Sequence, residues 1–144
     1  MIKERYVSSE VARLLRDKGF NEVCHATYDT AVTGGKPDFC EYEVLSFFPR
    51  GMKNTDDKYN MVISAPSQAV ACDWIEETFN ISIELWTGLF GYEMSVRYAK
   101  KNFTLTGEII NKEDMPTGDN SDGSWSNKEQ AYNDMIKYVL TNLV

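Results

Sequence analysis

Histidine is almost absent from this sequence, which contains only His25 among its 144 residues. Zinc sites with two histidines and the H-E-x-x-H helix of metalloproteases need at least two imidazoles, so both are excluded. Any nucleophilic pair of serine or cysteine with histidine would have to use His25 as its base. The scarcity of histidine therefore removes most of the familiar hydrolytic and metal-dependent active sites.

Cysteine is also scarce, and long apolar runs are missing. The three cysteines, Cys24, Cys40 and Cys72, form an odd set without a C-x-x-C pair, which disfavours a disulfide framework and favours a reducing cytoplasm. No apolar run approaches the ~18 residues that a membrane span needs. Because the first six residues are charged and lack an apolar core, we expect no secretory signal. The sequence therefore predicts a cytoplasmic protein without a membrane anchor.

Acidic groups outnumber basic ones, and they are unevenly distributed. The chain has 22 acidic and 15 basic residues, which gives a net charge of −7. Basic groups are in excess in residues 1–18, whereas acidic groups dominate residues 19–91. A negative body repels nucleic acid phosphate, so nucleic acid is not the expected partner. The 42% hydrophobic content is enough for a packed core.

Three segments have the periodicity of amphipathic helices. The first begins at Ser8 or Ser9 and ends at Gly19, the second follows Pro66-Ser67, and the third follows Ser126. Ser126 and Glu129 have the spacing of a capping box at the start of the third helix. The predicted core draws on the last two helices and the strand between them: Trp74, Ile75, Phe79, Ile81, Ile83, Met135, Ile136, Val139 and Leu140.

Between the second and third helices the periodicity changes to two. Ile81–Leu85 and Tyr92–Tyr98 alternate apolar and polar residues around a linker with two glycines, which predicts a β-hairpin. Short strands are expected at Tyr59–Ser64 and Phe103–Ile110, and residues 111–124 are expected to form a surface loop. The prediction is a single α+β domain over residues 1–144, with three helices packed on one mainly antiparallel sheet of about four to five strands.

Several short stretches, in this order and spacing, give the chain a family likeness. They are Arg5–Ser8, Ala12, Leu14-Leu15, Lys18–Phe20, Ala65–Gln68, Trp74, Ile81–Glu84, Ser126, Ala131, Ile136–Tyr138, Leu140 and Asn142-Leu143. With these residues the chain resembles a family of short uncharacterised proteins common in prophages and mobile elements of gut bacteria. Members of that family usually carry a basic residue at the position of Glu76. The resemblance implies a phage or mobile-element setting and brings no activity with it.

Two combinations of His25 with cysteine deserve consideration as sites. Cys24, His25, Cys40 and Cys72 include the soft ligands that zinc prefers, yet they lack the usual paired spacing. His25 with Cys40 has the composition of a thiol hydrolase pair, provided that the two lie within hydrogen-bond reach. The simpler interpretation is that the cysteines fill small spaces in the core and that His25 lies at a strand start.

Two further motifs are partial. Gly118–Glu129 overlaps a calcium-loop pattern, but Gly118 offers no side chain at the first ligand position. Tyr6–Leu15 resembles the first helix of a helix-turn-helix regulator, whereas the residues after Gly19 look extended rather than helical. Exposed aromatic residues would form a contact patch, although we expect at least half of this set to fill the core or cover its edge: Tyr42, Phe47, Phe48, Tyr59, Trp86, Phe90 and Tyr92.

The sequence as a whole favours a protein that binds another macromolecule. We expect a non-enzymatic, cytoplasmic accessory protein of a phage or mobile element, with a basic host or phage protein as its partner. The expected contact is an acidic face made by Asp73, Glu76, Glu77 and Glu84. A small hydrolase using His25 with Cys40 or paired carboxylates is the alternative, and a DNA-binding regulator acting through its N-terminal helix is the second. We expect no cofactor and no bound metal, and the sequence leaves the oligomeric state open.

Overall fold

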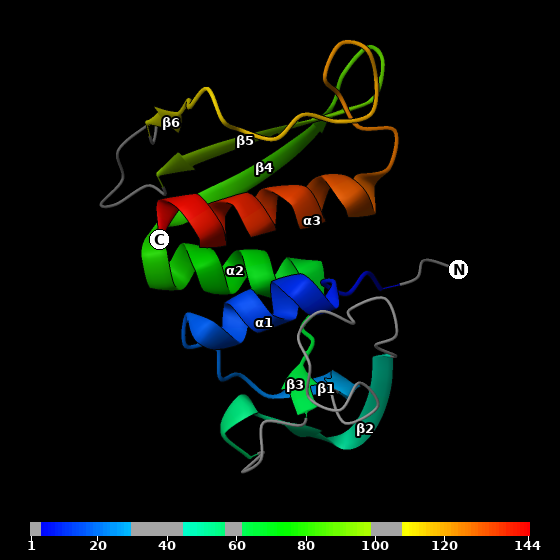
Figure 1. Cartoon of the computed structure of the whole chain (residues 1–144), viewed down its shortest axis with the longest axis vertical. Helices are drawn as coiled ribbons and strands as arrows, with labels where there is room; N and C mark the ends of the chain where they lie inside the picture. The colour runs from blue at the N-terminus through cyan, green and yellow to red at the C-terminus, as the bar shows by residue number, and fades with distance from the viewer. Residues whose placement is uncertain (1–3, 30–44, 57–61, 99–107) are drawn as a thin grey trace. The chain divides into compact units, whose positions relative to one another are not determined.

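The described part of the chain contains three helices and six strands, and the chain falls into two compact units, Met1–Ser67 and Gln68–Val144. The computed structural model describes residues 4–29, 45–56, 62–98 and 108–144 (Figure 1). The class is therefore α+β, as the sequence predicted. The two units are described below one at a time, and the single-domain organisation stays a prediction.

The first unit begins with helix α1 (Ser9–Asp17), whose ends are set by local sequence. The side chain of Ser8 caps the amino end by accepting a hydrogen bond from the Val11 amide. At the carboxyl end Gly19 takes a φ of 98°, and the Phe20 amide donates to the Leu15 carbonyl at 2.9 Å. This backbone reversal is a Schellman motif, for which glycine is the favoured residue. Both predicted ends of the helix are confirmed.

Three antiparallel strands form the sheet of the first unit, in the order β2-β1-β3. They are β1 (Cys24–Asp29), β2 (Leu45–Met52) and β3 (Val62–Ser64), with a 3-10 turn at Asn54–Asp56 after β2. Strand β2 lies at one edge and contains Pro49, which has no amide hydrogen to donate and is tolerated at such an edge. Of the expected strand at Tyr59–Ser64, the described part is β3, and residues 59–61 lie outside the described residues.

The segment before α1 is tied to the chain just after β3. Tyr6 pairs with Ser67, the Val7 amide donates to the Pro66 carbonyl at 3.1 Å, and the Tyr28 hydroxyl donates to the Val7 carbonyl at 2.7 Å. The buried apolar residues of this unit come from α1, its flanks and the strands β1 and β3: Val7, Val11, Ala12, Leu15, Phe20, Cys24, Ala26, Ile63 and Ala65.

The second unit contains helices α2 (Gln68–Phe79) and α3 (Lys128–Tyr138), and α3 continues as a π-helical turn at Val139–Leu143. Asn80 has a φ of 60° and joins α2 directly to the strand that follows. The side chain of Asn127 caps α3 by accepting from the Gln130 amide at 3.1 Å. The predicted capping box of Ser126 and Glu129 is therefore wrong, because the Ser126 hydroxyl donates to Asp119 instead.

The sheet of the second unit is also antiparallel, in the order β4-β5-β6. Strands β4 (Ile81–Thr87) and β5 (Tyr92–Tyr98) form the predicted hairpin, and β6 (Ile109–Ile110) pairs with β5 at Val96 and Arg97. Figure 1 shows α2 and α3 side by side along one face of this sheet. The rest of the expected strand Phe103–Ile110 includes residues 103–107, which lie outside the described residues.

The prediction of one sheet with four to five strands is wrong, because the six strands form two separate sheets. The first sheet ends at Ser64, and the chain passes through Pro66 into α2 before the second sheet begins. Alternating apolar residues indicate that a segment is a strand, but they do not show which strands pair with it. Periodicity alone could not have divided the strands between two sheets.

The predicted core is confirmed for six of its nine residues. Ile75, Ile81, Met135, Ile136, Val139 and Leu140 are all buried. Trp74, Phe79 and Ile83 are only half-buried, and the Trp74 and Phe79 rings make an edge-to-face contact with centroids 5.4 Å apart. Within the described ranges, no helix has the length and apolar character required to cross a bilayer.

Candidate functional site

Among the described residues of the second unit, the two most exposed large apolar side chains lie at the tip of the β4–β5 hairpin. Leu89 is 89% exposed and Phe90 is 69% exposed, and Trp86 at the end of β4 is 44% exposed. Single exposed apolar side chains are common on protein surfaces, but a group of three at one turn is a feature of contact sites. This group is called the hairpin tip below.

The hairpin tip is held by the loop that leads into α3 (Figure 1). The Gly88 amide donates to the Gly91 carbonyl across the turn at 2.7 Å, and the Asn120 side-chain amide donates to the Phe90 carbonyl at 3.0 Å. Tyr92 and Trp125 exchange two backbone hydrogen bonds of 2.8 and 2.9 Å. These bonds fix the backbone on which Leu89 and Phe90 are displayed.

The loop itself is built on two aspartates. Asp119 accepts hydrogen bonds from the amide and hydroxyl of Ser126, and Asp122 accepts from the amide and hydroxyl of Ser124. These bonds stabilise the charged carboxylates and lower the pKa of Asp119 and of Asp122 below the usual aspartate value. At neutral pH the loop is therefore fastened by two ionised acceptors.

A hollow of about 420 Å³ lies beside the hairpin tip, between strand β5 and the residues before α3. Its apolar lining includes two tryptophans and three methionines: Trp86, Trp125, Met94, Met115 and Met135. Four charged residues also line it: Glu93, Lys112, Glu113 and Asp122. This hollow is called the methionine pocket below.

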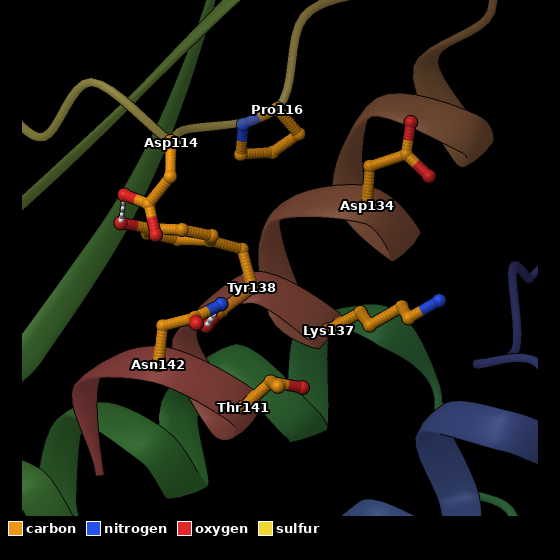
Figure 2. A pocket seen from close by; sticks show the side chains of 7 residues that line it. All are labelled: Asp114, Pro116, Asp134, Lys137, Tyr138, Thr141 and Asn142. Atoms are coloured by element: carbon orange, nitrogen blue, oxygen red, sulfur yellow. Dashed lines mark hydrogen bonds between the residues drawn. The ribbon is translucent and has the colours of Figure 1, made fainter.

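A second hollow, of about 370 Å³, lies along the outer side of α3 (Figure 2). Figure 2 shows Tyr138 reaching Asp114, to which its hydroxyl donates at 2.8 Å, with Pro116 beside the pair. Burial and the Asp114 carboxylate both raise the pKa of Tyr138, so the phenol stays protonated at neutral pH. The pair ties α3 to the preceding loop, which is a structural role.

Another carboxylate of that hollow, Asp134, is also fully engaged. Its two oxygens accept from the indole N–H of Trp125 at 2.9 Å and from the side-chain amide of Gln130 at 2.6 Å. A carboxylate with both oxygens occupied in this way is a poor general base. We therefore regard the pocket on α3 as a weaker candidate than the surface around the hairpin tip.

The four residues of the predicted acidic face do not share one surface. Asp73, Glu76 and Glu77 are exposed on α2, as their spacing predicted. Glu84 lies on β4, where its carboxylate pairs with Arg97 at 3.0 Å. Because side chains alternate along a strand, Glu84 and Arg97 lie on the sheet face opposite the buried Ile81 and Val96, away from the helices.

Cys24 and His25, which were considered together as zinc ligands, do not share a face of their strand. Cys24 is buried and His25 is exposed, so they point to opposite faces of β1. The Phe48 carbonyl lies 3.1 Å from Nδ1 of His25, which therefore carries the hydrogen and donates it. Cys40 lies outside the described residues, so the proposed pair with His25 stays a prediction. Among the described residues, no three histidine, cysteine, aspartate or glutamate side chains gather as metal ligands.

The calcium-loop and helix-turn-helix patterns are explained differently by the structure. A side chain at Gly118 would meet the Ser124 carbonyl carbon and oxygen within 2.4 Å, so this glycine is required for loop packing. The carboxylate of Asp122, which the calcium-loop pattern would use as a ligand, instead accepts a hydrogen bond from the Ser124 hydroxyl. After α1 the chain forms strand β1, where a helix-turn-helix motif would place its recognition helix.

The aromatic residues listed from the sequence are partly exposed and partly outside the described ranges. Phe47, Phe48, Trp86 and Phe90 are exposed, Tyr92 is half-buried, and Tyr42 and Tyr59 lie outside the described residues. Leu89 and the three methionines were not expected at the site. The linker Trp86–Gly91 already carried a signal, because three of its six residues are large and apolar in a turn that normally favours polar ones.

In comparisons with protein-family models, with curated proteins and with solved structures, none matches this chain.

Proposed function

We propose that this chain acts by binding another protein, with the hairpin tip as the contact. The observation that carries the proposal is that Leu89 and Phe90 are the most exposed large apolar side chains among the described residues, and their turn is pinned by a neighbouring loop. Apolar anchors on a pre-formed backbone favour binding because little conformational entropy is lost when they dock. The phage or mobile-element setting and the cytoplasmic location belong to the same proposal.

The exposed acidic residues of α2 support a second contact within this function. Asp73, Glu76 and Glu77 lie one turn apart on a helix whose opposite side carries the buried Ile75. A surface of this kind accelerates association with a basic partner and is sensitive to salt. We propose that it assists the encounter, whereas the hairpin tip supplies the lasting contact.

The test is affinity capture from a lysate of the source organism with the whole chain as bait. We expect the L89S/F90S double variant to lose the partner that the wild-type chain retains, because truncating apolar anchors costs ~2 kcal/mol or more each. The matched control is I109S, since Ile109 is 58% exposed on β6 of the same sheet but lies outside the tip. The control should retain the partner.

The charge-reversed variant D73K/E76K/E77K separates the two contacts. We expect it to slow capture at low salt while leaving the partner bound at equilibrium in moderate salt. If the double variant at the tip captures the same protein as wild type, the assignment of the tip is wrong. If the acidic variant alone abolishes capture, the lasting contact is on α2.

A further inference from the structure

The methionine pocket lies where strand β5 is bordered by loop rather than by strand. Strand β5 pairs with β6 at Val96 and Arg97 and with Trp125 at Tyr92, and the pocket opens beside Glu93 and Met94 between those two points. Of the residues that line it, Met135 and Trp125 are buried, whereas Met94 and Met115 are half-buried. Trp86, which is exposed and belongs to the hairpin tip, also lines the pocket.

The lining of the pocket suits an apolar side chain of variable shape. Methionine has three rotatable bonds and a polarisable sulfur, so methionine-lined surfaces adapt to different apolar occupants. The volume of about 420 Å³ is large enough for a leucine or an aromatic side chain with part of its backbone. A large hydrophobic side chain therefore fits the apolar part of the pocket.

The charged residues of the pocket determine what surrounds that hydrophobic residue. Glu93, Glu113 and Asp122 contribute three carboxylates against the single ammonium of Lys112. Asp122 is held in its ionised form, since the hydrogen bonds from Ser124 lower its pKa. Glu93 accepts the indole N–H of Trp86, which places a carboxylate at the margin of the pocket. An occupant that carries lysine or arginine beside its apolar residue is complementary to this rim.

We propose that the methionine pocket binds a basic amphipathic segment of the partner protein, with a large apolar side chain inside and lysine or arginine side chains on the rim. This inference rests on the proposed function and names the chemistry of the partner. An acidic rim around a methionine-lined apolar surface is the arrangement that suits basic amphipathic helices. A second copy of this chain fits less well, because it would bring two acidic rims together.

The experiment measures binding of a fluorescent amphipathic peptide made of leucine, phenylalanine and lysine to the full chain by anisotropy. The companion peptide has each lysine replaced by glutamate. We expect the lysine peptide to bind, the glutamate peptide not to bind, and affinity to fall as salt rises from about 50 to about 300 mM. Because an aromatic anchor is typically worth ~1–2 kcal/mol or more, W86S should weaken binding about tenfold, and W86F should recover most of it.

A matched pair of charge reversals tests the location. Glu113 and Glu108 are both exposed, but only Glu113 lines the pocket. We expect E113K to weaken peptide binding several-fold and E108K to leave it within about twofold of wild type, because Glu108 does not line the pocket and salt screens exposed charges. Circular dichroism spectra that match wild type show that each variant is folded.

Four results would overturn the proposal. Three are no binding of the lysine peptide at low salt, equal binding of both peptides, and equal losses in E113K and E108K. A wild-type dimer that W86S converts to a monomer would also overturn it, because a second copy would then cover the pocket. If lysate capture depends on Leu89 and Phe90 while the peptide fails, the proposed function stands and only this inference is lost.

Discussion

At the scale of single residues, the two described cysteines show how surroundings decide reactivity. Burial, with Glu22 nearby, raises the pKa of Cys24 to about 11. Burial, with Asp73 and Glu76 nearby, raises the pKa of Cys72 to about 12. Since the thiolate is the reactive form, both thiols are inert at neutral pH. They behave as small apolar side chains, which is how the sequence analysis interpreted them.

The raised pKa of Cys72 predicts a loss of stability at alkaline pH. Well below pH 9 the thiol is protonated in both folded and unfolded chains, so it contributes no pH dependence. Between about 9 and about 12 the unfolded chain ionises first, so the free energy of unfolding should fall as pH rises. Denaturant titrations of wild type and C72A should show a smaller alkaline loss in C72A. An identical loss in both would contradict the burial of this thiol.

At the scale of elements, the contact between the hairpin tip and the loop before α3 is the feature on which the proposals depend. A Cβ added at Gly91 would lie 2.5 Å from the backbone oxygen of Trp125, and backbone has little freedom to move. A Cβ added at Gly88 would lie 2.8 Å from the Glu93 side chain, which is flexible. The two glycines of one turn are therefore under different constraints.

This difference predicts that alanine at Gly91 lowers the free energy of unfolding more than alanine at Gly88 does. We expect G91A to destabilise the fold by ~1–3 kcal/mol and to speed amide exchange at Tyr92 and Trp125. G88A should cost less and leave that exchange unchanged. Hydrogen exchange followed by NMR, together with denaturant titrations, measures both. Equal effects of the two variants would mean that the loop does not hold the tip as described.

Helices and strands could be predicted where their cause is local, but the contacts between elements distant in sequence could not. The ends of α1 follow from Ser8 and Gly19, which act within a few residues of themselves. The start of α3 was misplaced because Ser126 and Asn127 are both good caps, and the choice depends on Asp119 from the loop. The methionine pocket was not foreseen because it assembles residues from β4, β5, α3 and the loop before α3. Such long-range pairing leaves no signature in periodicity.

At the scale of the whole molecule, the division into two units is itself testable. The unit Gln68–Val144 contains its own sheet, two helices and a set of buried apolar residues. It is longer than the ~55–65 residues with which many independent domains fold. The unit therefore meets the size and core requirements for folding alone.

We predict that a fragment containing residues 68–144 unfolds cooperatively, with the helix and strand content of that unit in the whole chain. Circular dichroism during urea titration would measure this, and the full chain is the comparison. A fragment that unfolds without a sigmoidal transition would show that its core needs the first unit. The single-domain prediction would then be favoured.

In the described sheet β2-β1-β3, strand β2 is an edge strand and carries the exposed Phe47 and Phe48. They are followed by Pro49 and by Gly51, which has a φ of 72°. Exposed edge strands with aromatic side chains can pair with strands of other chains, and fibrils grow by this kind of addition. Proline supplies no amide hydrogen for an incoming strand, and the glycine bends the backbone away from a flat template. We therefore expect the Pro49–Gly51 stretch to disfavour the addition of another chain to this edge strand, which displays two phenylalanines to the solvent.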